Sequence, residues 1–115
     1  MDTARVEFAP YSGDLMGLTA NKSHLVFRWS GPGKVLFSVS RRGDAASCHF
    51  ASDKMGLRHL KKAIDSFVLF VFWLFDWCMM VLAQVKRPSV GRLIEKVGFM
   101  PVTTVDDITV YARAR

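Results

Sequence analysis

Apolar and polar side chains alternate along two short runs, residues 34–40 and 44–50, as they do in strands with one buried face. A third strand-like run precedes them at residues 24–29. The turn sequences SGPG at 30–33 and RRGD at 41–44 connect the three runs, and connectors this short force neighbouring strands to run antiparallel. The pattern therefore predicts a three-stranded antiparallel meander.

The apolar spacing changes to that of a helix after the meander, with charged residues on the opposite face. The predicted buried stripe consists of Leu57, Leu60, Ile64, Phe67, Val68 and Val71. Ser52 or Asp53 is suited to cap the start of this helix, because each side chain carries an oxygen that can accept from the first turn. We expect the helix to cover residues 54–72.

The segment from residue 67 to residue 85 is apolar over nearly the ~20 residues that a membrane-spanning helix needs, and its one charge is Asp76. The preceding helical stripe is amphipathic, which favours a helix packed on a sheet, so we expect no membrane span. The unbroken apolar run at residues 77–85 instead predicts a strand that is covered on both faces.

Two further elements follow. Pro88 opens a short amphipathic helix that Gly98 ends, and residues 108–113 alternate as a last strand. A first strand at 5–9 and a turn-rich stretch at 10–23, with at most a short helix, precede the meander. The prediction is an α/β fold of the α+β type, in which an antiparallel meander is followed by a β-α-β-α-β series. A chain of 115 residues suits one domain, residues 1–115.

Charge and composition narrow the function classes. Half of the residues are hydrophobic, which argues against a disordered chain. The net charge is +6, and most of the excess lies in residues 54–115. This balance suits an anionic partner such as a phosphate cofactor or nucleic acid, or else a solvated basic surface. Cys48 and Cys78 form no CxxC pair, so we expect reduced thiols and no metal site.

The sequence RPSVGRLIEKVGF, residues 87–99, resembles a segment of the GCN5-related N-acetyltransferase superfamily, N-x-x-A-x-x-L-Y-x-K-x-G-F. Leu93, Lys96, Gly98 and Phe99 match it in register. The predicted order of elements is also similar to that fold. The resemblance implies an acetyltransferase-like domain of a family whose cofactor is acetyl-CoA. For this chain we expect weak acetyl-CoA binding or none, because the cofactor positions differ from the family pattern.

Several positions that carry chemistry in that family differ here. The tyrosine that protonates the leaving thiolate is replaced by Ile94, and the first asparagine by Arg87. The loop R/Q-x-x-G-x-G/A, which holds the pyrophosphate of the cofactor, aligns with residues 53–58. Only its first glycine, Gly56, is kept, and a carboxylate, Asp53, stands at the basic position.

The remaining candidates for a cofactor and catalytic site follow from the same alignment. Lys54, Gly56 and Arg58 are the candidate cofactor-binding residues, because the two cations can compensate for the missing basic position. The fourth strand carries no glutamate to act as a general base, which leaves His49 as the candidate there. A histidine on a sheet face also serves structural roles, so this assignment stays open.

A cluster of large rings surrounds Asp76. Phe72, Trp73, Phe75 and Trp77 exceed what one face of one element can bury, so we expect two or more of them on the surface of the monomer, covered by a second chain. Asp76 should then lie at the polar rim or pair with a cation. A protein partner or a homo-oligomer is the expected assembly.

Two functions remain compatible with the sequence. The losses at Ile94, Arg87 and the phosphate loop favour a catalytically degenerate acetyltransferase-like protein that binds another protein. The alternative is an active acyl-CoA-dependent N-acetyltransferase with a non-standard site. The short form and the step Phe50-Ala51-Ser52-Asp53 are similar to small acetyltransferase-like proteins of bacteriophages. That likeness implies a protein of the bacterial cytoplasm or the virion.

Overall fold

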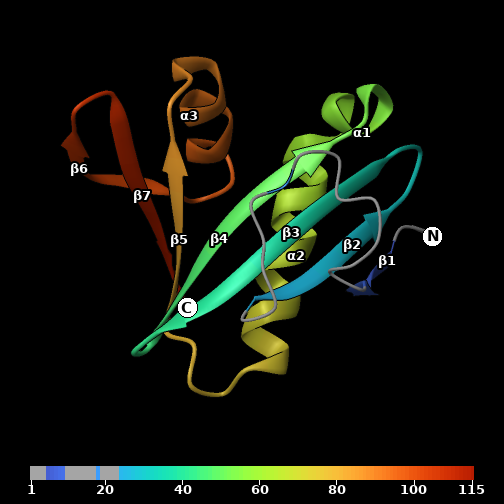
Figure 1. The fold of residues 1–115 in the computed structure, drawn as a ribbon, viewed down its shortest axis with the longest axis horizontal. Helices are drawn as coiled ribbons and strands as arrows, with labels where there is room; N and C mark the ends of the chain where they lie inside the picture. Colours follow the sequence, from blue (N-terminus) through green and yellow to red (C-terminus); the bar gives the residue numbers. More distant parts are fainter. Residues whose placement is uncertain (1–4, 10–17, 19–23) are drawn as a thin grey trace.

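The computed structural model describes residues 5–9, 18 and 24–115. Within these residues the chain forms a mixed sheet with helices packed on one face (Figure 1). The strands are β1 (Arg5–Ala9), β2 (Leu25–Ser30), β3 (Lys34–Arg42), β4 (Ala45–Ser52), β5 (Met80–Val85), β6 (Met100–Val105) and β7 (Ile108–Ala114). The helices are α1 (Lys54–Arg58), α2 (Leu60–Leu74) and α3 (Pro88–Glu95).

The sheet has the strand order β1-β2-β3-β4-β5-β7-β6. All neighbours are antiparallel except β4 and β5, which run parallel because α1 and α2 carry the chain from the end of one strand back to the start of the other. The β5–β7 pairing joins the last hairpin to the meander. The described strands therefore form one continuous sheet.

The main core lies between the sheet and α2. Val35, Phe37 and Val39 alternate on the helical face of β3, and the apolar stripe of α2 covers them. The rings of Phe37 and Phe67 stack with their centroids 4.0 Å apart. Leu18, Val26 and Leu36 form a smaller cluster on the other face. The expected meander and mixed α/β fold are confirmed.

Two elements differ from the sequence-based expectation. The helix expected at residues 54–72 is two helices separated by a turn at His59, and Leu57 is 57% exposed instead of buried. The turn lets α1 dock on the start of β3, while α2 lies across the sheet. The strand expected at residues 77–85 begins only at Met80, and Gln84 is exposed, so β5 is not fully covered on both faces.

The edge strand β6 was not expected from the sequence. All six of its residues are exposed, so no alternation of apolar and polar side chains reveals it. Gly98 does end the preceding helix, at a φ of 92°, and Phe99 is buried behind it, as the matched motif predicts. The expectation of at most a short helix at residues 10–23 falls outside the described residues apart from Leu18.

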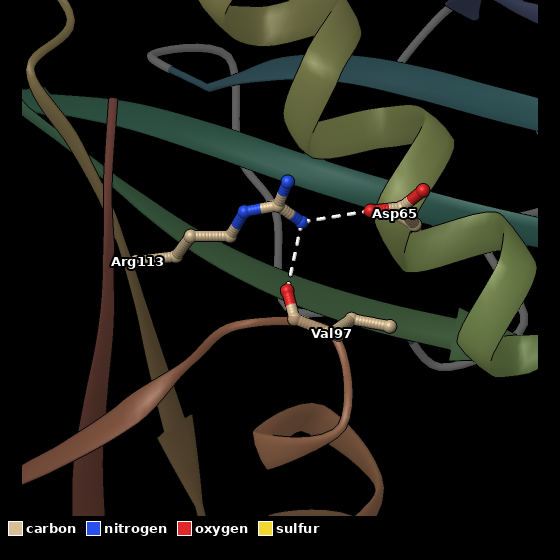
Figure 2. Close-up of polar contacts among 3 residues, drawn as sticks. All are labelled: Asp65, Val97 and Arg113. Atoms are coloured by element: carbon tan, nitrogen blue, oxygen red, sulfur yellow. Dashed lines mark hydrogen bonds and ion pairs between the residues drawn. The ribbon is translucent and has the colours of Figure 1, made fainter.

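Arginines near the C-terminus tie the helical layer to the last strand. The Arg113 guanidinium donates to the Asp65 carboxylate at 2.9 Å and to the Val97 carbonyl at 2.8 Å, so β7, α2 and the end of α3 meet at one side chain (Figure 2). Arg115 donates to the carbonyls of Phe72, Phe75 and Cys78. None of the described helices combines the length and hydropathy that crossing a membrane requires.

Candidate functional site

The parallel strands β4 and β5 pair over only four positions, from Ala45 opposite Met80 to Cys48 opposite Ala83. Beyond this point both strands continue without pairing to each other, and Figure 1 shows them diverging toward the end where α3 lies. Backbone N–H and C=O groups at such an opening are free to bond an extended ligand.

A cavity of about 170 Å³ lies at this opening. Its walls come from both strands and from the helices that cover them, and they are mainly apolar. The lining residues are Phe37, Cys48, His49, Phe50, Ile64, Phe67, Val68, Val81, Ala83, Gln84, Val85, Ile94 and Phe99. A mainly apolar wall suits a small organic group better than a bare ion.

His49 is the lining residue that can act as a base near neutral pH, and it enters the lining between Cys48 and Phe50. It is half-buried and lies opposite Ser38 on the face of the sheet away from α2. Burial, with His24 as a second cause, lowers the pKa of His49 below its ordinary value. The imidazole is therefore neutral at pH 7 and able to accept a proton.

Two other lining residues, Ile94 and Cys48, supply neither a proton donor nor a nucleophile. Ile94 is buried and has no proton to donate to a leaving group. Cys48 packs in the core, as its position on the strand predicts. Burial, with Cys78 as a second cause, raises the pKa of the Cys48 thiol far above its ordinary range, so the sulfur stays protonated and is a poor nucleophile.

The predicted phosphate loop places an internal carboxylate where an anion would bind. Asp53 caps α1, and its Oδ1 accepts from the Gly56 amide at 2.6 Å and from the Lys34 amide at 3.1 Å. These two bonds, with that from Lys34 the stronger influence, lower the pKa of Asp53 below its ordinary value. The carboxylate is therefore ionised at pH 7.

The turn between β2 and β3 closes the same end of α1. Gly33 packs backbone to backbone on Gly56, so that a Cβ atom on Gly33 would clash with the Gly56 amide. Gly56 is buried, whereas Lys54 and Arg58 are exposed on the outside of the helix. The structure thus encloses the one matched glycine and leaves the two candidate cations facing solvent.

The sequence did not identify this closure, because Gly33 lies more than twenty residues before Gly56. One signal could have revealed the closure: Gly33 directly precedes Lys34, and Gly56 follows Asp53 by three positions. Lys34 and Asp53 exchange hydrogen bonds in both directions. The Asp53 amide donates to the Lys34 carbonyl at 3.1 Å, while the Lys34 amide donates to the Asp53 carboxylate.

The four rings predicted at an interface do not share one face. Phe72 is 9% exposed and belongs to the core, which corrects the prediction for that residue, because it continues the buried stripe four residues after Val68. Trp73, on the opposite side of the helix, is 75% exposed. Phe75 and Trp77 are half-buried and pack on each other at 5.0 Å. Asp76 is exposed.

No protein-family model and no curated protein sequence matches this chain. Its fold, however, matches many solved structures. A Bacillus subtilis acetyltransferase in complex with CoA superposes with a TM-score of 0.74 over 97% of this chain and 99% of its own, at 9% identity.

Two larger enzymes match over less of their length. AAC(6')-Ib in complex with ribostamycin and coenzyme A has a TM-score of 0.62 at 17% identity, over 82% of this chain and 65% of its own. The dodecameric spermidine N-acetyltransferase from Vibrio cholerae has a TM-score of 0.66 at 12% identity, over 82% of this chain and 66% of its own. The chain therefore spans about two thirds of these enzymes, and it has the fold of the GCN5-related N-acetyltransferases.

Proposed function

We propose that this chain is an acetyltransferase-like protein that has lost strong binding of acetyl-CoA and acts by binding a second protein chain. The observation that carries the proposal is the Asp53 carboxylate on the Gly56 amide. A pyrophosphate at this end of α1 meets an ionised carboxylate and an amide that already has its acceptor. Like charges at such close range repel, and the desolvated phosphates gain no hydrogen bond in return.

The Asp53 side chain can be altered so that its charge and its hydrogen bond are tested separately. Asp53→Asn removes the charge but keeps an oxygen that can accept from Gly56, whereas Asp53→Ala removes both. We expect acetyl-CoA to raise the melting temperature least for the unmodified protein, more for Asp53→Asn and most for Asp53→Ala, with apparent affinity rising by about five- to tenfold at the last step.

Without ligand, Asp53→Ala should melt at lower temperature than the unmodified protein because it removes the cap of α1, whereas Asp53→Asn keeps the capping oxygen and should melt close to it. Arg58→Gln serves as the control, because it changes one exposed charge at the other end of α1. If the Asp53 variants respond to acetyl-CoA as the unmodified protein does, the carboxylate is not what limits binding.

The proposed binding surface is an aromatic face on the outer half of α2 and the edge strand β1. Ring contacts link Phe8 to Phe27, Phe27 to Phe70 and Phe70 to Trp73, at centroid distances of 4.6, 5.5 and 5.9 Å. Phe8 and Trp73 are exposed, as is Leu69 beside them. An exposed apolar face next to an edge strand favours association with another chain.

We take a second copy of this chain as the partner, a choice supported by the dodecameric assembly of the spermidine N-acetyltransferase. Trp73→Asp should convert the oligomer to monomer in light scattering, since it places a charge on the most exposed ring of the face. Val102→Asp is the matched control, because Val102 is 64% exposed on β6 at the opposite edge of the sheet. A folded Trp73→Asp variant of unchanged mass would exclude this face as the interface.

The bacteriophage origin and the location in the host cytoplasm or virion remain part of this proposal, supported by the Phe50–Asp53 step. We likewise treat residues 1–115 as one domain. A second function, active N-acetyl transfer, is favoured by one observation: a neutral His49 on the wall of the β4–β5 cavity. That function predicts acetylation of an amine that depends on His49 and is lost in His49→Ala.

A further inference from the structure

A second cavity, of about 280 Å³, lies on the far side of β5 from the β4–β5 opening. It is formed where β5 ends and α3 begins, against the neighbouring strand β7. Its lining residues are Val85, Lys86, Arg87, Pro88, Arg92, Asp107, Thr109 and Tyr111. Apart from Val85, none of them lines the first cavity, so the two sites can be tested independently.

Positive charge dominates this cavity. Lys86, Arg87 and Arg92 are exposed, and none of them forms a salt bridge with another residue in the part of the chain that the structure describes. Asp107 contributes the one carboxylate of the lining. The site therefore carries a net charge of about +2, close to the opposite of the −1.5 to −2 that a phosphomonoester carries at pH 7.

Tyr111 supplies a hydroxyl group to the same cavity. Its side chain is 9% exposed, and among the described residues its hydroxyl has no hydrogen-bond partner. The hydroxyl lies against the first turn of α3 at Gly91, where a Cβ atom would clash with it. A hydroxyl without a protein partner on the wall of a cavity is available to donate a hydrogen bond to a ligand.

The start of α3 adds to the attraction for an anion. Arg87 stands at the N-cap and makes no side-chain hydrogen bond to the first turn. This contrasts with α1, whose first turn Asp53 fills. The partial positive charge of a helix N-terminus favours phosphate groups.

We propose that this cavity binds the phosphate group of a small molecule. Arg87 and Arg92 provide planar donors for its oxygens, Lys86 provides a point charge, and the Tyr111 hydroxyl bonds one further oxygen. The group is either free phosphate or the phosphomonoester of an organic molecule, since both present the same dianion. This proposal does not depend on whether the chain binds acetyl-CoA.

Titration of the unmodified protein, followed by amide chemical shifts at constant ionic strength, tests the site with inorganic phosphate and with glycerol 3-phosphate. We expect saturable shifts at residues 86–92 with both probes. Tighter binding of glycerol 3-phosphate identifies an organic phosphomonoester as the occupant, and equal binding identifies the phosphate group alone.

Arg92→Gln should weaken phosphate binding about tenfold and Tyr111→Phe about threefold, because each removes donors to the anion. Lys96→Gln is the matched control: it removes one exposed charge just beyond the same helix and should leave binding unchanged. Equal weakening by Lys96→Gln, or shifts that never saturate, would contradict the proposal. Tighter, steeply salt-dependent binding of a single-stranded oligonucleotide to these residues would also overturn it, in favour of a nucleic-acid surface.

Discussion

Phe67→Ala should destabilise the protein by about 3–5 kcal/mol, the range observed when a fully buried phenylalanine is truncated. Phe67 is 1% exposed, and its ring stacks on Phe37 at an interplanar angle of 2°. The centroids of the Phe67 and Phe27 rings are 6.0 Å apart. Truncation removes the contacts of this ring with Phe27 on β2 and Phe37 on β3. It also leaves a cavity between α2 and the sheet, which the surrounding structure can fill only in part.

Urea unfolding followed by circular dichroism measures this loss. Because domains of this size are stable by only about 5–15 kcal/mol, the variant should unfold at far lower urea or be largely unfolded in its absence. Leu57→Ala is the matched control: Leu57 is exposed on α1, and its truncation should change the stability by less than about 0.5 kcal/mol. A Phe67→Ala loss below about 1 kcal/mol would contradict the described packing of α2 on the sheet.

Gly33→Ala should have the second largest effect, a destabilisation of about 1–3 kcal/mol or more. The added methyl group meets the backbone of Met55 and Gly56, and a backbone cannot rotate away as a flexible side chain can. Relief requires the β2–β3 turn and α1 to separate, which would also break the Lys34–Asp53 hydrogen bonds. Thermal unfolding should therefore begin at a lower temperature.

Gly43→Asn is the control for this substitution. Gly43 has a φ of 64°, a conformation that asparagine tolerates, and a Cβ atom there would have no neighbour within 4 Å. We expect its effect to stay below about 1 kcal/mol. If the two substitutions destabilise the protein equally, the tight contact between the β2–β3 turn and α1 does not exist in solution.

The strands of the meander and the buried stripe of α2 could be predicted because each has one buried face. Val35, Phe37 and Val39 carry the period of a strand, and Leu60, Ile64 and Phe67 carry that of a helix. The strand β6 could not be predicted in this way, since solvent on both of its faces leaves no period. The break at His59 could not be predicted either, because Leu57 extends the apolar spacing although it is exposed.

Only those features of the candidate site that depend on the identity of a single residue could be predicted from the sequence. The identity of Asp53 indicated that the loop repels a phosphate. His49 was the candidate general base because it lies on the predicted fourth strand. The contact of Gly33 with Gly56 is long-range and leaves no local pattern. Residues Lys86, Arg87, Arg92 and Tyr111 gather around one cavity only because β7 pairs with β5 beside the start of α3.

The β4–β5 opening and the capped α1 make opposite contributions to cofactor binding. The opening provides an apolar cavity and unpaired backbone groups, whereas Asp53 and Gly33 deny the first turn of α1 to a pyrophosphate. We expect the second effect to dominate, because the phosphates carry most of the charge of acetyl-CoA and charged groups are the most costly to bury without partners.

Calorimetric titration of acetyl-CoA into the unmodified protein at low salt tests this account most directly. We predict no saturable heat at ligand concentrations up to about 100 μM, which corresponds to a binding free energy weaker than about −5.5 kcal/mol. A dissociation constant below about 10 μM would contradict the account, because it would mean that the phosphates are bound despite the carboxylate of Asp53.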